Sequence, residues 1–182
     1  LSLTEMQMKR ALDFQEQIKG ISQEELFKVD PDKFIRLAVL RKELDESIQT
    51  LQTIQTKAIQ NDNRELFEST TQILAQGLLR KGEFEKAAGE FRQLALKTSS
   101  TLMKSEALRL AAQAELQNDN VVTALQHYVQ ALEINPANTN AKEALRQLEL
   151  NALININRGL GIERTSLYKE FEKSNQNLGC MG

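Results

Sequence analysis

The sequence contains few of the residues from which catalytic and metal sites are usually built. Its 182 residues include one histidine, one cysteine and no tryptophan. One histidine and one cysteine cannot form a His/Cys zinc site within one chain, and a single cysteine excludes an intrachain disulfide. We therefore expect no metal, no cofactor and no disulfide framework.

Proline and glycine are also scarce, with two and eight residues respectively. A β-rich or α/β chain of this length normally shows more of the glycine and proline that punctuate strands and turns. No alternating strand pattern appears in the sequence either. These two observations predict an all-α protein.

Neither the charge nor the hydropathy of the chain indicates a nucleic-acid or membrane partner. The formal net charge is −2, so there is no excess of positive charge to hold a polyanion. The longest apolar runs, such as residues 37–40, are far shorter than the run of about 18 that a membrane helix needs. We therefore expect a soluble protein with no nucleic-acid partner.

The compartment is only weakly indicated by the sequence. Its first residue is leucine rather than methionine, so we expect a processed or excised piece from which any signal or anchor has been removed. Cys180 lies in a polar, glycine-flanked tail that suits a reducing or an oxidising environment. The expected compartment is the cytoplasm, with an exported form left open.

Apolar periodicity and helix-capping residues predict helices along the whole chain. The predicted helices span residues 4–19, 22–27, 32–60, 64–80, 84–97, 103–117, 121–134, 139–157 and 165–173. The stripe of the first helix is only partial, because Gln15 lies among its apolar residues. The run 32–60 fits either one long helix or two helices with a break near Lys42.

Two segments of the chain share one pattern. Residues 82–94 and 119–131 each begin at a turn residue, with alanine five positions later (Ala87, Ala124) and an aromatic nine positions later (Phe91, Tyr128). The alanine lets two helices approach closely, and the aromatic fills the space between units. Because one such helix pair cannot bury its apolar face alone, the pairs must stack. A generic helical bundle with accidental periodicity is the alternative.

At these residues the sequence resembles the tetratricopeptide repeat family. The resemblance covers two units at about 68–138, with a fainter copy at about 28–62 and a first helix of a further unit, serving as a cap, at 139–157. Residues 131–136 are the most family-like stretch. The family's early tryptophan is replaced by Thr71 and Leu108, and its first-helix glycine by Ala75 and Ala112.

The resemblance implies a short right-handed solenoid of antiparallel helix pairs. It implies an N-terminal helical extension at 1–30, a repeat domain at 31–157, and a short helix with a flexible tail at 158–182. It also implies a groove lined by the first helix of each unit. The partner-binding residues carried over to this groove are Arg36, Gln72, Gln76, Leu79, Arg80, Arg109, Gln113, Leu116 and Gln147. The same carry-over includes Lys33, Ser69, Glu106, Gln117, Asn140 and Glu143.

Spacing supports the groove independently, since Gln72, Gln76 and Arg80 lie four residues apart on one helix face. Glutamine and arginine are donors suited to the carbonyls and carboxylates of a peptide. The alternative is that these residues only keep the surface soluble. Some family members bind acidic chaperone tails through lysine and asparagine, but the matching positions here hold Gln72, Gln76, Glu106 and Leu110, so a different ligand is implied.

No constellation of residues indicates catalysis. His127 has no partner histidine or acidic neighbour in a recognised motif, and Cys180 has no nearby positive charge to activate it. The glycines at 159 and 161 lack the third glycine of a dinucleotide loop. We therefore expect a non-enzymatic module that binds a protein or peptide and takes no small-molecule substrate.

Two other functions are left open by the sequence. The first is a self-assembling scaffold, a homo-oligomer, suggested by the long span 31–60 and its Gln/Thr-rich face. That face consists of Gln49, Thr50, Gln52, Thr53, Gln55 and Thr56. The second is a chaperone for secreted proteins, because some of those are short repeat stacks with an N-terminal helical extension.

Overall fold

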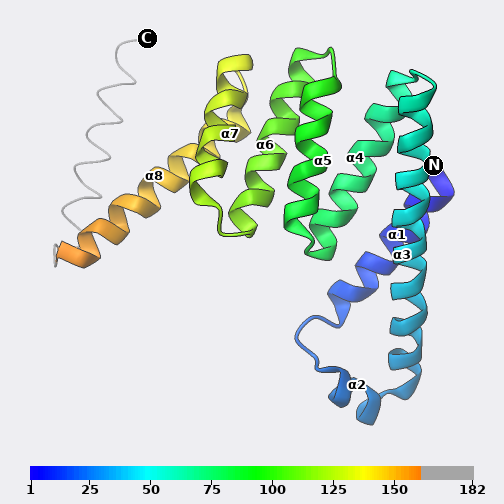
Figure 1. Ribbon diagram of the computed structural model, residues 1–182. Helices are drawn as coiled ribbons and strands as arrows, with labels where there is room; N and C mark the ends of the chain where they lie inside the picture. The colour runs from blue at the N-terminus through cyan, green and yellow to red at the C-terminus, as the bar shows by residue number, and fades with distance from the viewer. Residues whose placement is uncertain (161–182) are drawn as a thin grey trace. The chain divides into compact units, whose positions relative to one another are not determined.

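The computed structural model describes residues 1–160, and every regular element in that range is an α-helix (Figure 1). The helices are α1 (Ser2–Gln17), α2 (Gln23–Val29), α3 (Pro31–Gln60), α4 (Arg64–Lys81), α5 (Phe84–Lys97), α6 (Thr101–Gln117), α7 (Val121–Ile134) and α8 (Thr139–Leu160). The prediction of an all-α protein is confirmed for these residues. The helix predicted at 165–173 and Cys180 lie outside the described residues.

Local capping residues explain where the helices begin. Ser22 forms a capping box with Glu25 at the start of α2. The side chains of Asp30, Asn63 and Ser100 each accept a hydrogen bond from the backbone N–H three residues on. At the other end of α4, Gly82 has a φ of 88°, a left-handed conformation that glycine adopts without strain. These local signals mark the starts of α2, α3, α4 and α6 and the end of α4.

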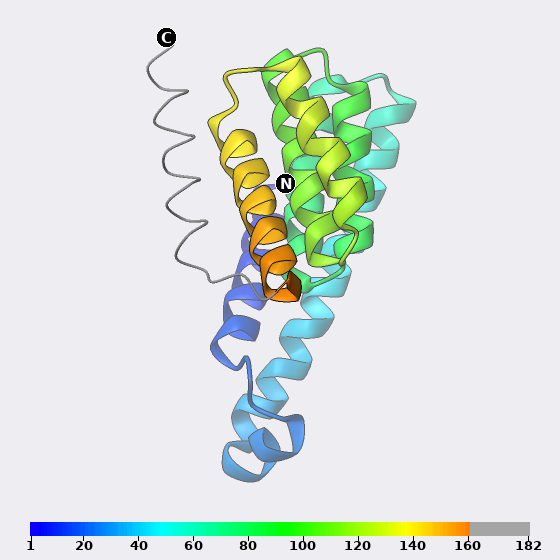
Figure 2. The ribbon, with the colours of Figure 1, turned by 90° about the vertical axis from the view of Figure 1, so that its left-hand side faces the viewer.

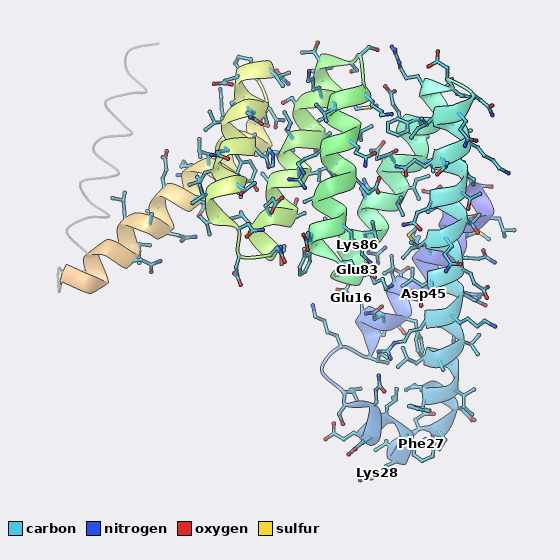
Figure 3. All side chains as sticks on the ribbon, in the orientation of Figure 1. Glu16, Phe27, Lys28, Asp45, Glu83 and Lys86 are labelled. Carbon is cyan, nitrogen blue, oxygen red and sulfur yellow. The ribbon has the colours of Figure 1, made fainter. Side chains whose placement is uncertain are left out.

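Residues 31–60 form one continuous helix, α3, without a break near Lys42. Pro31 occupies its first turn, where the missing N–H costs nothing. The sequence had left open a pair of helices here, and the structure shows a single one. The first half of α3 extends with α2 beyond α4 to α7 of the same unit, while α1 packs beside it (Figures 1 and 2). At this tip the Phe27 ring stands edge-on to Phe34, with ring centres 5.3 Å apart (Figure 3).

The described chain divides into two compact units, one of residues 1–138 and a second that begins at Thr139 with α8. In the first unit, consecutive helices from α3 to α7 pack against one another in antiparallel order, as Figures 1 and 2 show. α2 packs on α3, and α1 packs on both α3 and α4. The fold of this unit is therefore a series of sequential antiparallel helices.

Small buried residues bring these helices close together. Ala87, Ala124 and Ala131 are fully buried, as the shared pattern requires, and so are the aromatics Phe91 and Tyr128. An alanine at a helix crossing lets the two backbones approach, while an aromatic side chain fills the remaining space. The prediction that Ala87 and Ala124 are close-packing positions agrees with this burial.

Buried polar groups tie successive helices together. Ser105 Oγ donates to the carbonyl of Ala131 at 2.7 Å and accepts from Asn138 Nδ2 at 3.0 Å. Gln55 Nε2 donates to Thr71 Oγ1 at 2.9 Å and to Glu90 at 2.6 Å. These bonds satisfy groups that would otherwise destabilise the interior, and they link α6 to α7 and α3 to both α4 and α5.

The N-terminal helix α1 completes the first helix pair of the unit. Arg10 bonds Glu43 at 2.5 Å, and the Arg36 guanidinium lies 5.0 Å from the centre of the Phe14 ring, so α1 and α3 run antiparallel. Met8, Ala11, Leu12 and Phe14 are buried in the same core as α3 and α4. The first helix beside α3 is therefore α1 rather than part of residues 28–62.

None of the helices described between residues 1 and 160 is long and apolar enough to cross a membrane.

Candidate functional site

A cavity of about 560 Å³ opens between α1, α4 and α6. Helices α1 and α6 each present to it residues spaced by three or four positions, which share a helix face, whereas α4 contributes its last three residues. The lining residues are Leu12, Gln15 and Glu16 from α1, Lys19 from the turn after it, Leu79, Arg80 and Lys81 from α4, Gln113 and Gln117 from α6, and Gly82 and Phe84.

The turn after α4 positions one wall of this cavity. Gly82 ends α4 in a left-handed conformation, and its N–H bonds the carbonyl of Leu79 at 3.1 Å. The turn sends the chain directly into α5 at Phe84, whose ring joins Leu12 and Leu79 in the lining. The apolar part of the cavity therefore comes from three separate helices.

The cations at the end of α4 already have carboxylate partners. Arg80 donates to Asp13 of α1 at 2.6 Å, and Lys81 binds Asp45 at 2.7 Å and Glu83 at 2.6 Å. Figure 3 shows Asp45, Glu83 and Lys86 gathered at the same end of the helices, near Glu16. The positive charges at this end of α4 are thus neutralised within the chain.

This charge network shifts two pKa values. The pKa of the Glu83 carboxyl is lowered by its hydrogen bond from Lys81 and then by that from Lys86. Burial alone would lower the pKa of Lys81, but hydrogen bonds to Asp45 and Glu83 outweigh it and raise that pKa. Both groups are therefore charged over a wide pH range.

Three of the predicted binding residues, Leu79, Arg80 and Gln113, line this cavity. Leu116 is half-buried on α6 outside the lining. Gln72 and Gln76 are exposed earlier on α4, outside the lining.

The other predicted residues lie elsewhere. Arg36, on α3, lies over the ring of Phe14 on α1. Gln147 belongs to α8 in the second unit, where it donates to Glu143 at 2.9 Å. Arg146 also donates to Glu143 and lowers the pKa of that carboxyl to about 2.

Arg109 already uses its hydrogen-bonding capacity within α6. Its guanidinium donates to both carboxylate oxygens of Glu106, at 2.6–3.0 Å, and to Gln113 Oε1 at 3.3 Å. Its side chain is 17% exposed. An incoming carboxylate would therefore have to displace Glu106, so the geometry does not favour Arg109 as a free anchor.

Sequence reasoning missed the wall that α1 contributes. Leu12, Gln15 and Glu16 of α1, with Lys19 just after it, line the cavity although this segment was expected to be an extension. The available signal was Gln15, a polar residue within the apolar stripe of that helix. Such a residue on a packed face indicates a place where the face opens to solvent or to a ligand.

Metal-binding geometry is not found among the described residues. In residues 1–155, whose side chains are described, no three His, Cys, Asp or Glu side chains lie close enough together to hold a metal ion.

No protein-family model, curated protein or solved structure matches this chain. The conclusions about its function therefore depend on its own residues.

Proposed function

We propose that the chain is a non-enzymatic interaction module whose cavity between α1, α4 and α6 binds a segment of a partner protein. The observation that supports this most directly is the composition of the lining. Three glutamines alternate there with Leu12, Leu79 and Phe84, while the neighbouring cations Arg80 and Lys81 are paired within the chain. Apart from the oppositely charged Glu16 and Lys19, the cavity thus offers uncharged hydrogen-bonding groups and apolar surface.

Such a lining suits a peptide main chain. A glutamine side chain both donates and accepts, so it can bond the N–H and the C=O of an extended or helical segment. Gln15 approaches from α1, and Gln113 and Gln117 from α6. The apolar residues between them can cover side chains of the segment, which supplies most of the binding free energy.

The tetratricopeptide-like pattern supports the same assignment. In that interpretation α1, α4 and α6 are the first helices of three successive pairs, and first helices line the groove of such stacks. The cavity is lined mainly by these three helices. The helix pairs would then be α1 with α3, α4 with α5, and α6 with α7, with α8 as the cap.

A crosslinking experiment tests this proposal. A photo-crosslinking amino acid at position 113 in the full chain should capture a partner, whereas the same group at position 93 on α5 should not. A peptide from the captured segment is then titrated with variants. We expect Leu79→Ser and Gln113→Ala to weaken its binding by about tenfold each, and Gln93→Ala to leave it unchanged.

The salt dependence of peptide affinity is a second measurement that tests the proposal. Arg80 and Lys81 are paired within the chain, and the remaining charges of the lining, Glu16 and Lys19, are of opposite sign. Affinity should therefore change less than about threefold between about 0.05 and 0.5 M salt. A peptide that binds equally well to Gln113→Ala and to the unmodified chain would place the partner on another surface.

Self-assembly through α3 is the second candidate function. Five of the six residues of its Gln/Thr-rich face are exposed, and the sixth, Gln55, is buried. However, Thr50, Thr53 and Thr56 each donate to the carbonyl four residues earlier, at 2.8–2.9 Å. Their hydroxyl protons are therefore used within the helix. Sedimentation of the full chain separates the candidates, since a concentration-independent monomer contradicts self-assembly.

A further inference from the structure

A second groove, of about 330 Å³, crosses α5, α6 and α7 and shares no residue with the cavity described above. Its lining residues are Arg92, Ala95, Leu96, Lys104, Leu108, His127, Gln130, Glu133 and Ile134. Ala95 and Leu108 are buried, whereas Leu96 is 80% exposed beside them. A leucine that is so exposed next to buried apolar groups makes one wall of an apolar slot.

Basic side chains dominate the rim of this groove. Arg92 and Lys104 face it from α5 and α6, against the single carboxylate of Glu133 from α7. Arg92 comes only within 3.6 Å of Glu115, which already accepts a hydrogen bond from Asn120 at 2.8 Å. Lys104 forms no ion pair with any residue of the described chain.

His127 adds a third donor to the rim. Its Nδ1 is buried and has no hydrogen-bond partner among the described residues. A proton on Nδ1 would be a buried donor without an acceptor, which is costly. The neutral ring should therefore carry its proton on Nε2. Burial, followed by the nearby charge of Arg92, lowers the pKa of His127, while Glu115 acts in the opposite direction.

We propose that this groove is a second docking site, which takes a partner segment carrying a large apolar side chain beside a carboxylate. The apolar side chain fills the slot between Leu96, Leu108 and Ile134. The carboxylate meets the donors of Arg92, Lys104 and His127. Charge complementarity selects this occupant, because a neutral segment would leave Lys104 without an ion pair among the described residues and Arg92 with only its 3.6 Å contact to Glu115.

The two sites differ in the chemistry that they select. Beside the cavity between α1, α4 and α6, Arg80 and Lys81 form short ion pairs within the chain. At the rim of the second groove, Arg92 reaches Glu115 only at 3.6 Å, and Lys104 forms no ion pair among the described residues. A chain with both sites can hold an uncharged segment and an acidic segment at the same time. It would then connect two partners rather than bind one.

Nuclear magnetic resonance titration of the nitrogen-15-labelled full chain tests the proposal with short blocked peptides. The probe is acetyl-Glu-Leu-Leu-Glu-amide, with acetyl-Gln-Leu-Leu-Gln-amide and acetyl-Glu-Ala-Ala-Glu-amide as comparisons. We expect the first peptide to shift the signals of Leu96, Leu108 and His127. Each comparison peptide should bind at least about threefold more weakly, since it lacks either the charge or the apolar side chain.

Two exposed positions provide matched variants. Leu96→Gln removes the apolar wall, and Leu102→Gln makes the same change at a 70%-exposed leucine of α6 outside the groove. We expect at least about threefold weaker peptide binding for Leu96→Gln and for Arg92→Gln, and no change for Leu102→Gln. Equal binding of the acidic and neutral peptides, shifts located outside the groove, or no binding of the acidic peptide would each overturn the proposal.

Discussion

Gly77 lies directly against Met8, so that any larger residue at position 77 would force the Met8 side chain to move. A Cβ atom built on Gly77 would overlap the sulfur of Met8. Met8 is itself buried in the core shared by α1, α3 and α4. This contact places α1 beside α4, and it thereby forms the α1 wall of the proposed peptide cavity.

Gly77→Ala should therefore destabilise the protein. In an exposed helix the change would be favourable by about 1 kcal/mol. Here the added methyl group must displace Met8 within a packed core, which typically costs about 1–3 kcal/mol. We expect a lower free energy of unfolding in urea and faster amide exchange in α1.

Gly89 provides the matched control for this change. It lies inside α5, and a Cβ atom there would meet nothing within 4 Å. Gly89→Ala should raise the free energy of unfolding by about 0.5–1 kcal/mol, because alanine loses less backbone entropy on folding. If Gly77→Ala and Gly89→Ala changed the free energy of unfolding in the same direction, α1 would not pack on Gly77 as described.

Replacing Ala87 or Ala124 with leucine should also be costly. Both alanines are fully buried between helices, so the extra atoms must displace neighbours at a cost of about 1–3 kcal/mol. Ala137 is exposed in the segment after α7, and the same change there should cost much less. Thermal unfolding of the three variants checks this, and equal losses at all three positions would contradict the shared helix-pair pattern.

Local signals were sufficient to predict most of the helices. α5 and α7 begin and end at the predicted residues, because turns precede them and their small and aromatic residues repeat at helical spacing. The prediction for residues 31–60 left two alternatives, since nothing in that run distinguishes a straight helix from a broken one. The structure resolves this as a single helix, α3.

The position of α1 could not be predicted in the same way. It depends on pairs far apart in the sequence, such as Met8 with Gly77 and Arg80 with Asp13. A glycine within a helical pattern does not reveal which distant side chain it accommodates. For this reason the sequence predicted the α4 and α6 residues of the cavity, Leu79, Arg80 and Gln113, but not Gln15 on α1.

The ion pairs of Glu83 should make stability depend on acidic pH. The folded protein holds the Glu83 pKa below its usual 4.5 through Lys81 and Lys86. The contribution of these bonds is therefore complete above about pH 4.5 and is lost as the pH falls through the lowered pKa. Glu83→Gln should reduce the free energy of unfolding at pH 7 by about 1 kcal/mol or less.

The measurement is urea unfolding between about pH 3 and pH 7 for the unmodified chain and for Glu83→Gln. The variant should show a shallower loss of stability at acidic pH. Glu85→Gln is the control, because Glu85 lies in the first turn of α5 and forms no ion pair among the described residues. This variant should follow the unmodified chain. Parallel curves for Glu83→Gln and the unmodified chain would contradict the network.

His127, a base rather than an acid, should also make stability depend on pH, in this case at mildly acidic pH. Its pKa in the folded protein lies below the usual 6.5, first because the ring is partly buried and then because Arg92 repels the protonated form. The unfolded chain therefore takes up a proton before the folded chain does, so stability falls as the pH drops below about 6.5. His127→Gln should remove this part of the pH dependence.

The chain has a single histidine, so its ring signals in a proton magnetic resonance titration belong to His127 alone. A titration midpoint at or above 6.5 would show that the ring is not held neutral against α5 and α6, and acidic peptide bound in the second groove should move that midpoint upward.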